Sequence, residues 1–226
     1  MTTTLMTYAG PGEPDAPVTR TGGNPLAPAG TAWPGCATCG GPMRFLAQIV
    51  LDEEGRPVAA EGLAQGGRAQ GRVMAVFMCC NNPGMCEEWS PTAGGNRALL
   101  FPAEALRPMP VPEPEKDGDG GSLVLGAVNS VALVVMDCAD YGSAREEWAT
   151  RGGNSPANVL GQLGGEPDWL QGDETPSCPA CTRPMDLIAQ LEEGPDYATA
   201  MNFGGGGSAY SFACAPCARA VFLWQC

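Results

Sequence analysis

The sequence predicts a β-rich α+β protein, an internally duplicated β-sheet fold with pseudo-two-fold symmetry and two zinc-ribbon-like four-cysteine sites. Three observations lead to this fold class. Residues 22–48 match residues 164–190 without a gap at an offset of 142, and 11 of these 27 positions are identical. Cysteine pairs occur at equivalent places in both segments, and apolar runs with strand periodicity follow them. The 32 glycines and 22 prolines leave room for few long helices.

The identical positions of the repeat are glycines, prolines, both cysteines and four residues of the segment that follows them. They pair Gly22 with Gly164, Gly23 with Gly165, Pro25 with Pro167, Gly30 with Gly172, Pro34 with Pro176, Cys36 with Cys178, Cys39 with Cys181, Pro42 with Pro184, Met43 with Met185, Ala47 with Ala189 and Gln48 with Gln190. The repeat divides the chain into a first copy (residues 1–106), a linker (residues 107–122) and a second copy (residues 123–226). Proline, glycine and charged residues dominate the linker, as is typical of an exposed connection.

The run after each cysteine pair alternates as a half-buried strand does. Its apolar positions are Met43, Phe45, Ala47 and Ile49 in the first copy and Met185, Leu187, Ala189 and Leu191 in the second. We expect this face of each strand to belong to the core. Residues 72–79 and 209–214 are predicted to form a second strand in each copy, and residues 123–137 one or two more.

A helix is predicted only over residues 143–150. Ser143 is a suitable N-cap there, and Glu146 would occupy the third helical position. Gln48 and Gln190 lie on the strand face opposite to the core positions. We expect both amides to bridge backbone groups of neighbouring elements rather than to contact a ligand.

The cysteine spacing predicts two structural Zn²⁺ sites. A tetrahedral zinc needs four converging thiolates, and the turn of a Cys-x-x-Cys segment directs two of them to one side. Two such sets of four occur in the chain. The first set is Cys36, Cys39, Cys79 and Cys86, and the second is Cys178, Cys181, Cys214 and Cys217. Four cysteines fill the zinc coordination shell, which favours a structural over a catalytic role.

The third ligand of the first site is Cys79 or Cys80 by position alone. The repeat favours Cys79, because residues 77–79 match residues 212–214. Cys80, Cys138 and Cys226 remain outside both sites. We expect them to be small buried side chains or surface thiols, not nucleophiles.

The absence of histidine excludes Ser-His-Asp triads, Cys-His pairs and His-ligated catalytic metals. The single lysine, Lys116, lies in the acidic linker, where no pocket would desolvate it for Schiff-base chemistry. We therefore expect a protein without enzymatic activity. The alternative is a thiol- or zinc-dependent enzyme of unknown substrate, whose activity would depend on Cys80 or Cys138.

Cysteine usage and the N-terminal segment indicate a cytoplasmic protein. The cysteine count of 11 is odd, and residues 1–17 carry no lysine or arginine that could begin an export signal. The longest apolar run, residues 123–136, contains Asn129 and Ser130 and is too short to cross a bilayer. We expect reduced thiols and no membrane association.

The formal net charge of −13 is unevenly distributed. Residues 1–106 carry nine acidic and six basic side chains, whereas residues 107–226 carry sixteen and six. A field of this sign repels phosphate backbones and attracts basic proteins. We expect a basic protein partner and no nucleic acid. The oligomeric state is left open.

Several motifs resemble those of a known family. A Gly-Gly-x-Pro word, a tryptophan-containing spacer, Cys-x-x-Cys and Pro-Met-x-Phe-Leu-Ala-Gln lie within residues 22–48, and Phe-x-Cys-Cys follows at residues 77–80. Residues 163–170 and 210–214 repeat parts of this pattern. The motifs resemble the eukaryotic programmed cell death protein 2 family and the related YwqG-like bacterial proteins of unknown function. The resemblance covers about two thirds of the chain.

The resemblance implies a duplicated β-sheet protein without known enzymatic activity. Eukaryotic members act as chaperones of a small-subunit ribosomal protein, and some bacterial members lie near toxin genes. It therefore implies a zinc-binding protein-interaction module, a chaperone or an immunity-type protein, whose basic partner is a ribosomal protein or a toxin. The Pro-rich acidic linker and the enlarged loop of residues 80–86 depart from the family pattern, so no partner-binding residue is carried over.

Overall fold

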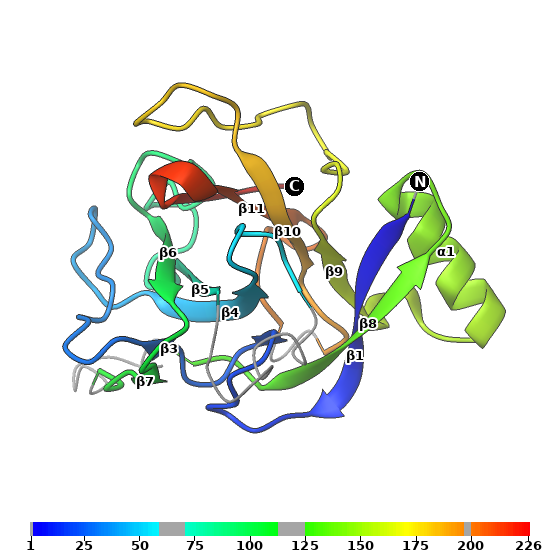
Figure 1. Ribbon diagram of the computed structural model, residues 1–226, viewed down its shortest axis with the longest axis horizontal. Coiled ribbons are helices and arrows are strands. Elements are labelled where there is room, and N and C mark those ends of the chain that lie inside the picture. Colours follow the sequence, from blue (N-terminus) through cyan, green and yellow to red (C-terminus); the bar gives the residue numbers. More distant parts are fainter. Residues whose placement is uncertain (1, 59–70, 113–124, 197–199) are drawn as a thin grey trace.

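Ten of the strands form one curved antiparallel sheet. The computed structural model describes residues 2–58, 71–112, 125–196 and 200–226, and Figure 1 shows their arrangement. The strands and helices are β1 (Thr3–Pro11), β2 (Arg20–Thr21), β3 (Leu26–Ala27), β4 (Arg44–Leu51), β5 (Arg72–Met78), β6 (Asn96–Pro102), β7 (Arg107–Pro108), β8 (Asn129–Met136), α1 (Tyr141–Gly152), η2 (Pro156–Asn158), β9 (Val159–Leu163), β10 (Asp186–Glu192), β11 (Ser208–Cys214), η3 (Ala215–Cys217) and β12 (Arg219–Gln225).

The ten strands of the sheet follow the order β12-β11-β10-β9-β1-β8-β2-β4-β5-β6, and β3 and β7 form a separate two-stranded sheet. The edge strands β12 and β6 contact each other, so the sheet nearly closes into a barrel. Two hydrogen bonds cross near this seam. The Trp224 amide donates to the Trp89 carbonyl over 3.4 Å, and Arg72 Nη1 donates to the Ala215 carbonyl over 3.1 Å.

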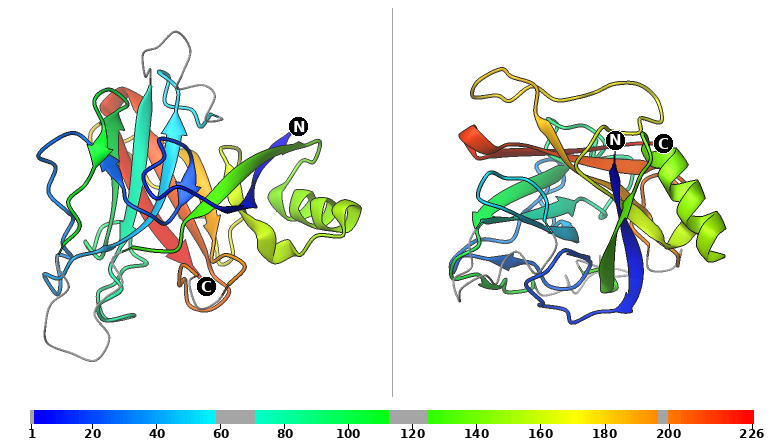
Figure 2. Two further views of the ribbon diagram at one scale, coloured as in Figure 1. Left: turned by 90° about the horizontal axis from the view of Figure 1, so that it is seen from below. Right: turned by 45° about the vertical axis from the view of Figure 1, so that its right-hand side comes forward.

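Strands β1 and β8 occupy the middle of the sheet. They pair with each other, β1 also pairs with β9, and β8 also pairs with β2. Hairpins β4–β5 and β10–β11 lie on opposite sides of this central pair, and β6 and β12 extend them. Figure 2 shows α1 at the side of the molecule formed by β1 and β8, away from β4, β5 and β6. There α1 packs on Leu5 and Met136.

The predicted strands after the cysteine pairs are present as β4 and β10, but the prediction that each buries only one face was wrong. Register irregularities lie between Phe45 and Ala47 and between Leu187 and Ala189. Because of the first irregularity, Phe45 packs in one cluster and Ala47 in the main core. The segment carrying Ala27 covers the second face of β4, so seven of its eight residues are buried.

The second predicted strands correspond to β5 and β11, and β8 forms within residues 123–137. Residues 113–122 of the predicted linker lie outside the described residues. Met109, which the sequence assigned to an exposed linker, is buried, and its amide donates to the Pro25 carbonyl over 2.9 Å. The start of the predicted linker therefore belongs to the packed structure. No helix of the described residues is long and apolar enough to cross a membrane.

The predicted helix over residues 143–150 exists, but it is longer and begins earlier. It spans Tyr141–Gly152, and its N-cap is Asp140 rather than Ser143. The Asp140 carboxylate accepts the Ser143 amide over 2.8 Å, which satisfies one of the free N–H groups of the first turn. The sequence offers two capping residues three positions apart, Asp140 and Ser143, and both residue types cap helices well, so the prediction chose the wrong one.

This cap makes a simple prediction. Asp140→Ala should lower the free energy of unfolding by about 1 kcal/mol, because the Ser143 amide loses its acceptor. Ser143→Ala should change it by less than about 0.5 kcal/mol, because its side chain is not the cap. Urea denaturation of both variants checks the assignment, and the opposite ranking would contradict it.

Candidate metal centres

The first cysteine group lies where β5 ends. A bridge between Gly35 and Pro42 closes a turn that carries Cys36 and Cys39, and Cys79 directly follows β5. The Cys36 amide donates to the Gly41 carbonyl over 2.9 Å, which holds this turn. The loop after β5 brings in the fourth cysteine. The Sγ atoms of Cys36, Cys39, Cys79 and Cys86 all lie within 4.8 Å of one another.

The second group has the same construction at the end of β11. A bridge between Ser177 and Pro184 closes the turn, and the Cys178 amide donates to the Arg183 carbonyl over 2.8 Å. Cys214 is the last residue of β11, and η3 carries the fourth cysteine. The Sγ atoms of Cys178, Cys181, Cys214 and Cys217 also lie within 4.8 Å of one another.

The sulfur spacing fits a metal ion better than a disulfide. Four sulfurs at about 2.3 Å from a tetrahedral zinc lie about 3.8 Å from one another. The Cys39 and Cys79 sulfurs are 3.7 Å apart, and those of Cys181 and Cys214 are 3.8 Å apart. All eleven cysteines are free, whereas a disulfide needs sulfurs about 2.05 Å apart. Each group could therefore hold one metal ion.

The structure places Cys79, not Cys80, in the first group. Cys80 Sγ lies 3.8 Å from the Met78 carbonyl, and burial raises the pKa of its thiol to about 11. Cys138 is buried with its Sγ 3.3 Å from Glu147 Oε2, and Cys226 is exposed. These three cysteines are the ones that the sequence left outside both groups.

One thiol in each group has a lowered pKa. Burial alone would raise the pKa of Cys36, but hydrogen bonds from the backbone of Cys39 and Thr38 bring it down to about 7. Hydrogen bonds from the side chain and backbone of Arg183 lower the pKa of Cys181 to about 6. The thiolate is the form of cysteine that binds metals. Both groups therefore favour that form at one position near neutral pH.

Two residues that contact the cysteines were not predicted from the sequence. Asn81 Nδ2 lies 3.5 Å from the sulfurs of both Cys39 and Cys79, and it donates to the Pro42 carbonyl over 3.2 Å. Arg183 contacts the Cys181 thiol. Both follow a cysteine by two residues, so their position in the sequence was the available signal. Hydrogen-bond donors at this distance stabilise thiolates and orient them.

Aromatic side chains pack against each cysteine group. The Trp33 and Phe77 rings lie 5.6 Å apart under the first group, and the Trp169 and Phe212 rings lie 5.9 Å apart under the second. Cys36 and Cys178 are both buried. This packing buries part of each cysteine group and fixes the ends of β5 and β11, whereas Cys39 is exposed.

The predicted bridging of backbone groups is confirmed for Gln48, whereas Gln190 contacts one backbone amide and otherwise the side chains of Gln162 and Glu192. Gln48 Oε1 accepts the Leu26 amide over 3.2 Å, and Gln190 Oε1 accepts the Asp168 amide over 3.0 Å. The Gln48 amide group also donates to the Val18 carbonyl over 3.1 Å. Both side chains are buried and link β4 or β10 to the segment before the cysteine turn.

The fold and the two groups define a class: a β-rich protein with a nearly closed sheet and two four-cysteine centres that could hold metal ions. No protein-family model matches the chain. A stretch of 71 residues, 30% of the chain, is 35% identical to the uncharacterized protein YpfL of Salmonella typhimurium. The match spans 15% of the length of that relative.

Proposed function

We propose that this chain is a non-enzymatic protein-binding module whose fold is stabilised by two structural zinc ions. The observation that carries the zinc assignment is the convergence of four sulfurs within 4.8 Å in each group, with one pair in each at 3.7 or 3.8 Å. The eight cysteines of the two groups would be the zinc ligands. A bound zinc would supply folding energy by crosslinking each cysteine turn to the end of β5 or β11. It would have no open coordination position, because four thiolates complete the shell.

We also propose that the fold is an internal duplication of residues 1–106 and 123–226. The register irregularities of β4 and β10 support it, since they fall at positions exactly 142 residues apart in number. Backbone bonds support it too. Gly22 and Gly164 donate to the carbonyls of Leu46 and Ile188 over 2.7 and 2.9 Å. In this arrangement the copies are interlocked, because β1 pairs with β9 of the second copy and β8 with β2 of the first.

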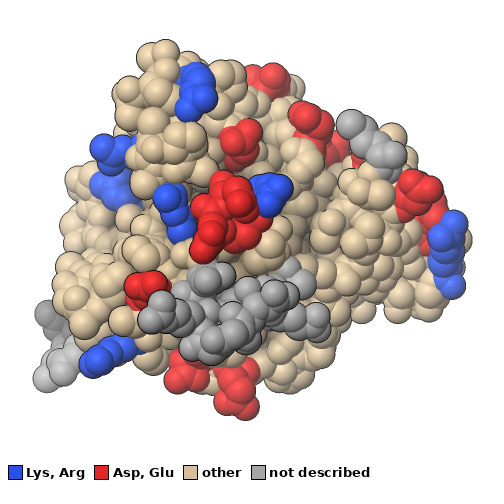
Figure 3. All heavy atoms as spheres, in the orientation of Figure 1, with Lys and Arg blue, Asp and Glu red and all other residues tan. Residues whose placement is uncertain are grey.

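The cysteines outside the two groups and the charge of the protein are better explained by a protein-binding role than by catalysis. Two of the three cysteines outside the groups are poor nucleophiles, since burial raises the pKa of Cys80 to about 11 and also raises that of Cys138. Figure 3 shows acidic side chains spread over one face among fewer basic ones. Together with the net charge of −13, this favours a basic protein and opposes nucleic acid.

The resemblance to the programmed cell death protein 2 family and the YwqG-like proteins suggests which basic partner to seek. A ribosomal protein would indicate a chaperone, and a toxin would indicate an immunity-type protein. A thiol- or zinc-dependent enzyme is the alternative function. An activity abolished by Cys138→Ser or Cys80→Ser would favour it.

Metal analysis and partner capture test this proposal together. Untagged protein purified without added metal should contain about two zinc ions per chain, because each closed four-thiolate shell binds one. Tagged protein in its own host should capture one dominant basic protein at low salt and less of it at higher salt, because screening weakens charge attraction. Folded protein without metal would contradict the zinc assignment, and the absence of a partner at either salt concentration would contradict the binding role.

A further inference from the structure

Arg20 and Gln162 occupy equivalent places in the two halves of the sheet. Arg20 of β2 lies opposite Gln48 of β4, and Gln162 of β9 lies opposite Gln190 of β10, both in antiparallel pairs. Gln48 and Gln190 are one of the identical pairs of the repeat. The strand register therefore makes Arg20 and Gln162 equivalent, although one is a cation and the other is neutral.

The guanidinium of Arg20 is enclosed by the first half of the chain. It donates to the carbonyl of Ala16 over 3.1 Å and to the carbonyls of Gly22 and Asn24. Asp15 attracts it electrostatically. Arg20 is only 1% exposed, so a cation from outside the protein has no access to these carbonyl groups.

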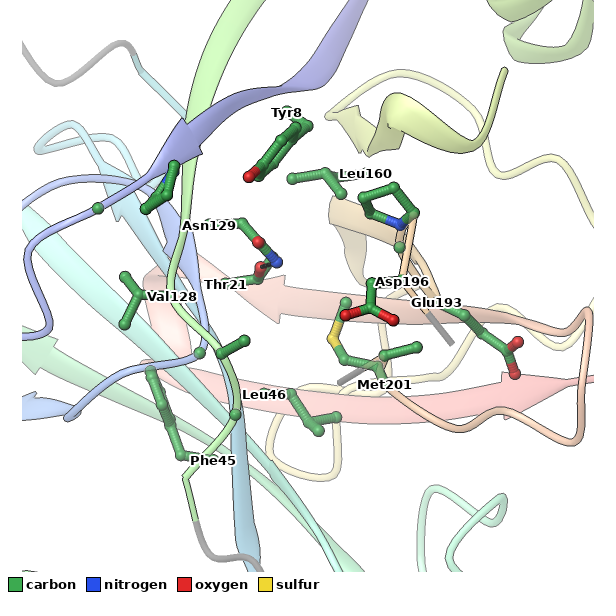
Figure 4. Close-up of a pocket in the computed structure, with 18 residues that line it drawn as sticks. Tyr8, Thr21, Phe45, Leu46, Val128, Asn129, Leu160, Glu193, Asp196 and Met201 are labelled. Atoms are coloured by element: carbon green, nitrogen blue, oxygen red, sulfur yellow. Dashed lines mark hydrogen bonds between the residues drawn. The ribbon is translucent and has the colours of Figure 1, made fainter. Parts of the chain in front are cut away.

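The large cleft beside β2 does not open this guanidinium to solvent. Figure 4 shows this cleft, which has a volume of about 620 Å³ and is lined by Thr21 but not by Arg20. Thr21 Oγ1 accepts Asn129 Nδ2 of β8 over 2.9 Å, which holds β2 beside the central strands. The first half therefore keeps its own cation at this position.

Gln162 makes only part of the contacts that Arg20 makes. Gln162 Nε2 donates to the carbonyl of Glu166 over 3.0 Å, and Glu166 is equivalent to Asn24, whose carbonyl accepts Arg20. Nε2 also donates to Gln190 Oε1 over 3.0 Å, so both of its N–H groups have acceptors and the orientation of the amide is fixed. Gln162 is 2% exposed, and its Oε1 accepts no hydrogen bond from the residues that the structure describes.

A small cleft lies beside Gln162, which is shorter than Arg20. Its volume is about 180 Å³, and it lies between the start of α1 and residues 165–168. A Cβ at Gly165 would lie 3.8 Å from Gln162 Oε1, whereas a Cβ at the equivalent Gly23 would lie 2.9 Å from Arg20 Nη1. The volume is below the range of about 300–1,000 Å³ typical of whole small-molecule ligands, so the cleft suits the end of one side chain.

The cleft is acidic. Asp140, Glu166 and Asp168 line it, and none of the other described residues around it is lysine or arginine. A Cβ at Gly142 would lie 3.6 Å from Asp140 Oδ1 and 3.7 Å from Asp168 Oδ2, so these two carboxylates face the same small space. The Asp168 carbonyl accepts the hydroxyl of Tyr210 over 2.7 Å, which holds Asp168 in place. The cleft thus presents acceptors and negative charge to a ligand.

We propose that this cleft binds the guanidinium of an arginine side chain from the basic partner protein, as the first half binds Arg20. The proposal rests on the protein-binding function above and assigns it to a site. Gln162 Oε1 accepts one N–H group of the ligand, and the carboxylates of Asp140 and Asp168 balance its charge. Arginine suits the cleft better than lysine, because its planar group has five donors for acceptors on several sides.

The test measures binding of a fluorescein-labelled peptide in which arginines alternate with serines, by fluorescence anisotropy with the full chain at low salt. The same peptide with citrulline in place of arginine keeps the shape and removes the charge. We expect the citrulline peptide to bind about tenfold more weakly, because charge-assisted hydrogen bonds are lost.

Two variants locate the binding site. Gln162→Arg should weaken binding of the arginine peptide at least about tenfold, because the new guanidinium occupies the cleft as Arg20 does in the first half. Asp168→Asn should weaken it by about tenfold, because the ligand loses a charged acceptor. The control is Glu146→Gln, at an exposed glutamate of α1 outside the cleft, which should change binding by less than about twofold. All three substitutions raise the net charge by one, so they differ only in position.

Each other outcome has a definite meaning. If both cleft variants bind the peptide as the parent chain does, the cleft assignment is wrong and the protein-binding function stands. If the parent chain does not bind the peptide, the inference is wrong, and capture of a basic protein from the host decides the proposed function separately. If free argininamide displaces the peptide at equal concentration, the cleft is a site for small cations and the polypeptide assignment is wrong. Thermal unfolding of Asp168→Asn should match the parent chain, because this side chain is exposed, so the test remains decisive even if Gln162→Arg does not fold.

Discussion

Replacing Cys178 with serine is expected to remove one of two zinc ions per chain and to lower the melting temperature by about 8–16 °C. A metal ion held by this group would crosslink the turn before β10 to the end of β11, and Cys178 is a buried member of the group. Loss of this crosslink should cost at least about 4 kcal/mol of unfolding free energy, since structural zinc sites contribute folding energy directly. In a chain of this length, 1 kcal/mol corresponds to about 2–4 °C. Cys36→Ser should have an effect of the same size.

The matched control is Cys226→Ser, the same substitution at an exposed cysteine outside both groups. It should leave two zinc ions and an unchanged melting temperature. Zinc is measured by mass spectrometry of the purified proteins and unfolding by calorimetry. A Cys178→Ser protein that retains both ions and its full stability would show that this cysteine is not a ligand.

The loss of one metal site should also lower the stability of the other half of the molecule. The Ala215 carbonyl beside the second group accepts Arg72 Nη1 of β5, and the Trp89 carbonyl, in the loop that follows the first group, accepts the Trp224 amide of β12. The β1–β9 and β2–β8 ladders connect the halves as well. We therefore expect Cys178→Ser to unfold in a single transition. Two separate transitions would show that the halves are independent.

The candidate metal centres could be predicted from the sequence because their geometry is mostly local. A Cys-x-x-Cys turn sets two sulfurs by itself, and Cys79 and Cys214 lie where their strands end. The choice between Cys79 and Cys80 needed the repeat, which compares the first copy with the second. The role of Gln48 was also recognisable, since an amide opposite a core face has few uses other than to bridge backbone groups.

The features that sequence reasoning missed depend on partners far away in the chain. Nothing near Thr3 indicates that β1 pairs with Met136 at the end of β8. The second buried face of β4 needs Ala27 and Met109, which pack on it from two other segments. The hairpin after β4 reaches the second half of the chain, where a Cβ at Gly55 would lie 2.7 Å from the Ala215 Cβ. Hydrophobic periodicity describes one strand at a time and does not indicate which distant strands or segments it contacts.

Gly22→Ala is expected to cost about 3–4 kcal/mol of unfolding free energy, whereas Gly164→Ala should cost only about 1–2 kcal/mol. The two glycines are equivalent in the repeat and have nearly equal φ angles of +65° and +61°. An alanine at either place adopts a left-handed conformation, and that strain accounts for the smaller cost. A Cβ at Gly22 would in addition lie 2.0 Å from the Ala127 carbonyl oxygen, whereas none of the atoms around Gly164 comes within 4 Å.

The comparison of Gly22→Ala with Gly164→Ala isolates the steric effect of the added Cβ, because the amides of Gly22 and Gly164 make equivalent hydrogen bonds to Leu46 and Ile188. Urea denaturation gives both free energies, and equal m values would show that the unfolded states are comparable. The extra cost at Gly22 measures the close approach of the segment before β8 to the first half. Equal costs would mean that this segment moves aside freely and is not held in place by packing.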